Sequence, residues 1–134
     1  MRLLVLGGTQ FLGRHLVQAA RDAGDVVTIF HRGRTNPDLF AGQVERIAGD
    51  RDGGLDALAG GEWDAVVDTC GYVPRVVGAS ARALAERCGH YTFVSSESVY
   101  GDVGRAFAEH GDWIAAETLA VALEPGAELA VSRA

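Results

Sequence analysis

A continuous apolar run that ends in glycines and gives way to a helical pattern is the feature that most constrains this fold. Residues 2–6 read RLLVL, as expected for a strand buried on both faces of a parallel sheet, and glycines follow at once. The next apolar residues recur at steps of four, three and four, up to Gly24, which would end a helix. The predicted buried face of this helix holds Leu12, Leu16, Ala19 and Ala23. The chain therefore begins as strand, glycine turn and helix.

The same alternation of strands and helices continues to about residue 100. Further strands are predicted at residues 26–30, 44–48, 63–68 and 90–95, and a short helix at 53–60. A longer helix is predicted from about Pro74, a residue suited to a first helical turn, to Cys88, with Gly89 just past its end. Its predicted buried face holds Val77, Ala81, Leu84 and Cys88. This order predicts an α/β fold, a Rossmann-like, doubly wound parallel sheet of five strands with right-handed crossovers.

The composition changes toward the end of the chain. Residues 1–101 carry twelve acidic residues against ten arginines, whereas residues 102–134 carry six against two. In the second part, Asp112 is a candidate N-cap for a helix that reaches Leu123. We therefore divide the chain into a Rossmann-type domain at 1–101 and an acidic helical tail at 102–134. A five-stranded sheet that stops here has an open edge, so we expect the tail helix to cover it or the chain to form a homodimer.

Composition and charge exclude several classes of protein. Of the 134 residues, 48% are hydrophobic, but no apolar run approaches the roughly 20 residues of a membrane span. The N-terminal segment has no long apolar region with a cleavage site, so we expect a cytoplasmic protein with no membrane partner. The net charge of −6 disfavours nucleic-acid binding. Cys70 and Cys88 lack the spacing of metal ligands, so we predict no metal and expect buried, reduced thiols.

The glycine turn is the candidate binding site. Its residues are Gly7, Gly8, Thr9, Gln10, Phe11, Leu12 and Gly13. Where a strand passes into a helix, glycines let backbone N–H groups approach phosphates closely, and the helix N-terminus adds about half a positive charge. This pattern favours a nucleotide pyrophosphate, although any tight strand-to-helix turn also selects glycine.

The residues after the second predicted strand indicate which dinucleotide would bind. An NAD site has a carboxylate there, about 20 residues after the glycines, which binds the ribose 2′-hydroxyl. This chain has His31, Arg32, Gly33 and Arg34 instead. Because a guanidinium forms charge-assisted, bidentate hydrogen bonds with phosphate, Arg32 and Arg34 favour NADP(H) over NAD(H). The alternative is a solvated basic loop.

Four segments together resemble one family. They are GGTQFLGRH at 7–15, GDRDG at 49–53, VVDTCGY at 66–72 and VSSESVYGD at 94–102. On these motifs the chain, up to about residue 101, resembles the extended or atypical NAD-dependent epimerase/dehydratase branch of the short-chain dehydrogenase/reductase superfamily. The resemblance implies a nicotinamide dinucleotide cofactor, Asp50 facing the adenine, and a sugar nucleotide or other small carbonyl compound as substrate. Gln10 stands where the family has the middle glycine of GxxGxxG.

The resemblance also implies a catalytic set, of which this chain holds one member. The family uses a serine after a central strand together with a Tyr-x-x-x-Lys on the next helix, whose tyrosine is the acid/base catalyst. Ser96 matches the serine, but no tyrosine follows Tyr100 and the sequence contains no lysine. We therefore expect an NAD(P)-binding portion of such an oxidoreductase, truncated and catalytically incomplete by itself. The alternative is a non-enzymatic NADP(H)-binding sensor or interaction module.

Overall fold

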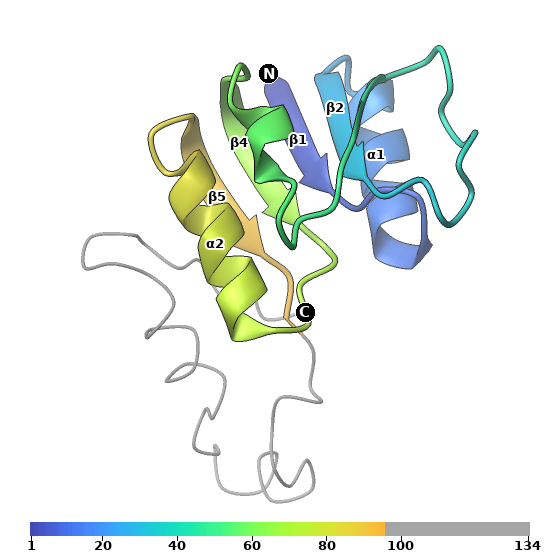
Figure 1. Ribbon diagram of the computed structural model, residues 1–134. Coiled ribbons are helices and arrows are strands. Elements are labelled where there is room, and N and C mark those ends of the chain that lie inside the picture. The colour runs from blue at the N-terminus through green and yellow to red at the C-terminus, as the bar shows by residue number, and fades with distance from the viewer. Residues whose placement is uncertain (96–134) are drawn as a thin grey trace, which may run out of the picture.

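The computed structural model describes residues 1–95, which form one parallel sheet with helices on both faces (Figure 1). The strands are β1 (Arg2–Leu6), β2 (Val26–His31), β3 (Glu45–Ala48), β4 (Trp63–Asp68) and β5 (Cys88–Phe93). The helices are α1 (Phe11–Asp22), α2 (Pro74–Leu84) and the 3₁₀-helix η1 (Leu55–Leu58). The strand order is β3-β2-β1-β4-β5, and every neighbouring pair is parallel. This confirms the predicted Rossmann-like α/β fold.

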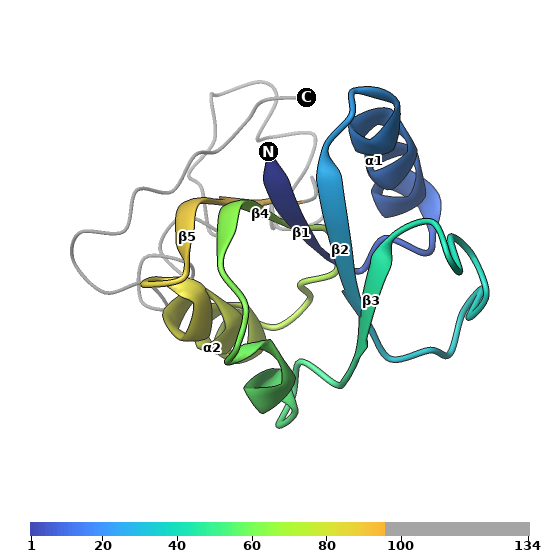
Figure 2. The same cartoon turned by 90° about the horizontal axis from the view of Figure 1, so that it is seen from above.

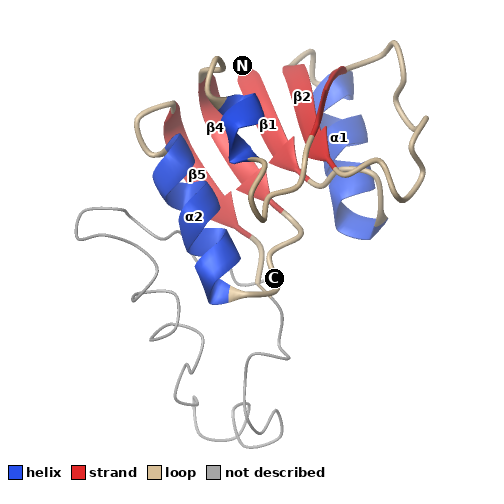
Figure 3. Ribbon diagram, viewed as in Figure 1, coloured by secondary structure: helices blue, strands red, loops and turns tan. Residues whose placement is uncertain are grey.

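The sheet lies between two helical layers (Figure 2, Figure 3). Helix α1 covers one face, over β1 and β2, while α2 and η1 cover the other. The buried core on the α1 side contains Leu3, Val5, Val17, Ala20, Val27, Ile29 and Phe40. The core on the α2 side contains Leu4, Leu6, Phe30, Leu58, Trp63, Val66 and Leu84. Because successive strand residues point to opposite faces, the continuously apolar β1 contributes to both cores.

The parallel strands place their carboxyl ends along one edge of the sheet, and the chain order reverses at β1. This strand pairs with β2 on one side and with β4 on the other. In open α/β sheets, ligands bind in the crevice at such a switch point. Within residues 1–95, no helix is long and apolar enough to cross a membrane, and no three His, Cys, Asp or Glu residues gather as a metal site.

The buried face of α1 differs from the predicted one. Its buried residues are Gly13, Val17 and Ala20. The predicted buried face holds Leu12, Leu16, Ala19 and Ala23, and none of these four residues is fully buried. Leu12 is 44% exposed. The prediction was wrong because Gly13, which has no side chain, lets the first turn of α1 approach the glycine turn, and this rotates the buried stripe by one residue.

Helix α2 ends at Leu84 rather than at the predicted Cys88, although Val77, Ala81 and Leu84 are buried as predicted. Cys88 and Gly89 open β5 instead. A Cβ on Gly89 would lie 3.0 Å from the carbonyl oxygen of Asp64, next to β5 in β4. This glycine therefore permits close pairing of two strands and does not end a helix.

Candidate functional site

A cleft of about 680 Å³ lies at the carboxyl edge of the sheet. Four segments build it, namely the glycine turn and the loops that follow β2, β3 and β4. The predicted binding residues that line it are Gly7, Gly8, Thr9, Gln10, Phe11, Arg32, Arg34 and Asp50. Two other predicted residues, Leu12 and Gly13, belong to the first turn of α1 and do not line the cleft. The fold thus brings together most of the residues that the sequence singles out.

The geometry of the turn requires its glycines. Gly7 and Gly8 have φ angles of +106° and +93°, which residues with side chains rarely adopt. A Cβ on Gly7 would lie 2.7 Å from Thr69 Oγ1, and one on Gly13 would lie 2.8 Å from the backbone nitrogen of Gly8. The turn is therefore packed against α1 and against the loop after β4, and it presents bare backbone to the cleft.

The N-cap and the first residue of α1 have unlike backbones. Gln10 is the N-cap of α1 in an extended conformation (φ −140°, ψ 157°), so the position of the family's middle glycine needs no positive φ in this chain. Phe11 has a φ of +37° and its side chain is 89% exposed. A non-glycine residue in this region is strained by about 1 to 3 kcal/mol. The backbone strain of the turn therefore lies at Phe11, on the rim of the cleft.

The loop after β2 presents basic side chains to the cleft. Arg32 and Arg34 are exposed, and neither forms an ion pair with any described residue. The Gly33 amide donates to His31 Nδ1 at 3.1 Å, and Arg46 Nη2 lies 3.3 Å from Nε2. A neutral ring has only one accepting nitrogen, so it accepts from one of these donors at a time. Burial, together with the charge of Arg46, lowers the pKa of His31. The imidazole is therefore neutral at physiological pH, and the positive charge that this loop presents to the cleft comes from Arg32 and Arg34.

Asp50 lies on the wall of the cleft, in the loop after β3. Its Oδ1 accepts a hydrogen bond from the Asp52 amide at 3.0 Å, and its carbonyl oxygen accepts one from the Gly54 amide at 2.7 Å. On the β2 side, Asn36 Nδ2 donates to the carbonyl oxygen of Thr9 at 2.8 Å. Local hydrogen bonds therefore hold both walls in a defined shape before any ligand arrives.

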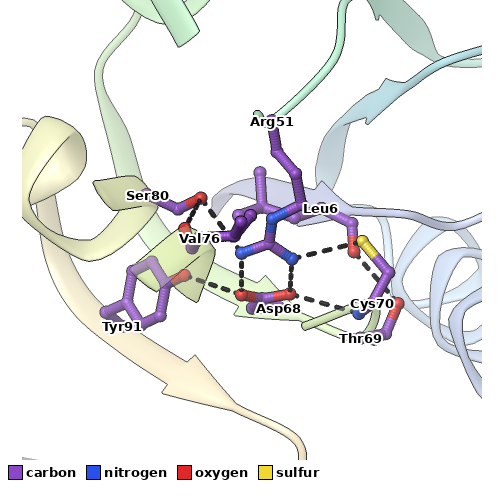
Figure 4. Close-up of polar contacts among 8 residues, drawn as sticks. All are labelled: Leu6, Arg51, Asp68, Thr69, Cys70, Val76, Ser80 and Tyr91. Carbon is purple, nitrogen blue, oxygen red and sulfur yellow. Dashed lines mark hydrogen bonds and ion pairs between the residues drawn. The ribbon is translucent and has the colours of Figure 1, made fainter. Parts of the chain in front are cut away.

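On the inner wall of the cleft, which Arg51 helps to line, lies a buried ion pair that the sequence analysis does not predict (Figure 4). The guanidinium of Arg51 forms a fork on the carboxylate of Asp68, with Nη1 to Oδ1 at 2.7 Å and Nη2 to Oδ2 at 2.5 Å. The Asp68 side chain is 0% exposed and that of Arg51 is 11% exposed. The available signal is an aspartate at the end of the apolar run VVD, because a carboxylate buried in a strand needs a cation.

Three further groups complete this network. Ser80 on α2 accepts a hydrogen bond from Arg51 Nη2 at 3.0 Å, the Tyr91 hydroxyl on β5 donates to Asp68 Oδ2 at 2.9 Å, and the Cys70 amide donates to Oδ1 at 3.1 Å. Burial lowers the pKa of Arg51, but the hydrogen bonds and charge of Asp68 outweigh burial and raise it. Burial and the charge of Asp68 also raise the pKa of Tyr91 and that of the Cys70 thiol. Both groups therefore stay protonated at physiological pH.

Some predicted features fall beyond residue 95. Ser96, the predicted catalytic serine, lies outside the described residues, as do Tyr100, the predicted tail helix and the boundary after residue 101. Both cysteines are free thiols, as predicted, but they are half-buried rather than buried.

Comparison with solved structures identifies proteins with the same fold. A UDP-galactose 4-epimerase is 24% identical, with a TM-score of 0.64 over 76% of this chain and 40% of that one. The UDP-glucuronic acid 4-epimerase from Bacillus cereus, solved in complex with NAD, is 18% identical, with a TM-score of 0.60 over 76% and 42%. A Rossmann-fold NAD(P)-binding family protein from Shigella flexneri is 20% identical, with a TM-score of 0.67 over 96% and 64%. No protein-family profile and no curated protein matches the sequence.

These similarities establish the fold. The chain spans 40% to 64% of the length of the three proteins. It has the Rossmann fold of UDP-galactose epimerases and of short-chain dehydrogenases/reductases, over part of their length. At the level of the fold, this confirms the resemblance found in the sequence.

Proposed function

We propose that this chain is the NAD(P)-binding portion of an epimerase/dehydratase-like oxidoreductase and that it prefers NADP(H). The observation that carries the proposal is the cleft at the switch point of the sheet, into which Gly7 and Gly8 present bare backbone. A fold neighbour, the epimerase from Bacillus cereus, was solved with NAD. The same proposal includes a second ligand beside the dinucleotide. This ligand is the substrate, a sugar nucleotide or another small carbonyl compound.

Each wall of the cleft would hold one part of the dinucleotide. The glycine turn and the N-terminus of α1 would bind the pyrophosphate, because backbone N–H groups and the helix dipole favour negative charge there. Asp50 would face the adenine, and Arg32 and Arg34 would bind the 2′-phosphate. The packing of Gly7 supports the fit of a pyrophosphate at the turn. A Cβ on this residue would collide with Thr69, so the position requires glycine and the backbone there stays bare. When bound, the nicotinamide ring would supply hydride transfer.

The first prediction concerns the choice of dinucleotide. Arg32→Ala should reduce the preference for NADP(H) over NAD(H) by about 1 to 3 kcal/mol, the range for a hydrogen bond to a charged group. Calorimetric titration with both dinucleotides measures this difference. Arg2→Ala is the matched control, because Arg2 is exposed at the amino end of β1, at the opposite edge of the sheet. Equal affinities of the unmutated chain for NADPH and NADH would refute the preference and leave a solvated basic loop.

The second prediction is that the chain alone does not turn over substrate at family-like rates. A Tyr-x-x-x-Lys cannot form because the sequence has no lysine, and a positioned general acid contributes about 10²- to 10⁴-fold. Tyr91 does not supply this acid, since its hydroxyl is bound to Asp68. Ser96→Ala should therefore change little in an assay of NADPH absorbance with sugar nucleotides and simple carbonyl compounds. Robust turnover that disappears in Ser96→Ala would show that the chain is a complete enzyme.

The absence of lysine also favours a second candidate function, a non-enzymatic NADP(H)-binding sensor or interaction module that acts as a homodimer. The genomic sequence immediately downstream of this coding sequence separates the two candidate functions. A frame that continues into a Tyr-x-x-x-Lys supports the portion of an oxidoreductase. A stop codon, together with NADPH binding that changes the oligomeric state in light scattering, supports the sensor.

A further inference from the structure

The dinucleotide contacts proposed above do not use the buried Arg51–Asp68 pair, although Arg51 lines the same cleft. Cys70 connects the two sites. Its sulfur lies 3.4 Å from Arg51 Nη1, and a Cβ on Gly7 would lie 3.5 Å from the same sulfur atom. The Cys70 amide also donates to the Asp68 carboxylate. Asp68 pairs in register with Leu6, the residue before Gly7, so its negative charge is held next to the strand end from which the turn begins (Figure 4).

A carboxylate and a bound phosphate repel one another unless a cation compensates. As a general scale, two unit charges about 8 Å apart at an effective dielectric constant of about 20 shift a binding equilibrium by more than tenfold. Arg51 supplies the compensating charge, and both of its terminal nitrogens bind the carboxylate of Asp68. Among the described residues, no other cation forms an ion pair with this carboxylate.

We propose that Arg51 is a positioning residue of the dinucleotide site, which cancels the charge of Asp68 beneath the pyrophosphate and anchors the loop that carries Asp50. This inference rests on the proposed function. The anchoring follows from the chain itself, because Arg51 is the neighbour of Asp50 and its side chain reaches β4 through Asp68 and α2 through Ser80. The loop after β3 cannot leave the cleft without breaking the buried pair.

An exposed fork from the same loop to α2 provides a matched control. Arg75 on α2 donates to both carboxylate oxygens of Asp52, each at 2.8 Å. These side chains are 68% and 55% exposed, so water and salt screen the pair. The Arg75–Asp52 pair has the same bidentate geometry as the Arg51–Asp68 pair. It differs in being exposed to solvent and in lying away from the glycine turn. Arg75→Met should therefore leave the affinity for NADPH within about twofold.

The test is calorimetric titration of NADPH into the full chain and three variants, each at low and high salt. Arg51→Met leaves Asp68 unpaired and should weaken binding about tenfold or more. Asp68→Asn leaves the cation unpaired below the phosphates and should retain or tighten binding, with a steeper loss of affinity as salt is added. The double variant Arg51→Met/Asp68→Asn carries neither charge and should bind within about threefold of the unmutated chain.

The direction of these changes separates charge compensation from a merely structural role. Both single substitutions break the same buried pair, so thermal stability should fall in both. If the pair acted only through the fold, affinity would fall in both single variants and at least as far in the double variant. Losses of that kind would overturn the proposal.

Two further outcomes separate a failure of the role proposed for Arg51 from a failure of the proposed function. If Arg51→Met does not fold, Arg51→Lys takes its place, since it keeps the charge without the fork and should bind NADPH within about threefold. A tenfold loss in a folded Arg51→Lys chain would overturn the role in charge compensation. Failure of the unmutated chain to bind either NADPH or NADH would refute the proposed function, and this inference with it.

Discussion

Gly13→Val is expected to weaken dinucleotide binding more than a hundredfold, to the point where titration detects none. A Cβ at this position would lie 2.8 Å from the nitrogen of Gly8 and 3.0 Å from its Cα. These are backbone atoms, so no side-chain rotation relieves the overlap, and a β-branched side chain adds two methyl groups to it. Either α1 or the glycine turn must move. Because overpacking of this kind costs about 1 to 3 kcal/mol even when the structure adjusts, and the adjustment displaces the turn itself, binding is lost.

The control for this prediction is Gly60→Val. Gly60 has no atom within 4 Å of an added Cβ, and it is exposed before β4. Its substitution should leave the affinity within about twofold. Circular dichroism and thermal melting establish that both variants fold. A folded Gly13→Val chain that binds NADPH as the unmutated chain does would show that the turn is not the pyrophosphate site.

Asp68→Ala is expected to lower the free energy of unfolding by about 3 to 5 kcal/mol, the range for breaking one partner out of a buried ion pair. Three changes combine. The Arg51 guanidinium loses its counterion, the Tyr91 hydroxyl loses its acceptor, and a cavity forms at the end of β4. Because stabilities of small domains lie at about 5 to 15 kcal/mol, this loss is a large fraction of the whole.

The exposed carboxylate of Asp52 provides the comparison. It forms the same bidentate contact with an arginine, but in solvent. Asp52→Ala should therefore leave the urea unfolding midpoint unchanged within error, whereas Asp68→Ala should shift it strongly. Equal shifts in the two variants would mean that burial does not govern the strength of these pairs in this chain.

Much of the fold follows from local sequence patterns. The strand at 63–68 has the predicted bounds, and β2 and β3 differ from prediction only at their ends. A strand buried on both faces needs an unbroken apolar run, and such runs are visible without knowledge of the partners. The predicted cleft residues from Gly7 to Phe11, with Arg32, Arg34 and Asp50, come together because parallel strands end at one edge. Their grouping therefore follows from the order of the elements alone.

The sequence by itself determined the alternation of strands and helices and the glycine turn, because hydrophobic periodicity and the need for positive φ are local properties. Only the tertiary structure decided which stripe of α1 is buried, since two neighbouring helical stripes can be equally apolar and the close contact of Gly13 with Gly8 selects between them. Only the tertiary structure revealed that Arg51 reaches Asp68. That pairing joins a loop to a strand end across the sheet, and its strength comes from burial, which no local pattern contains.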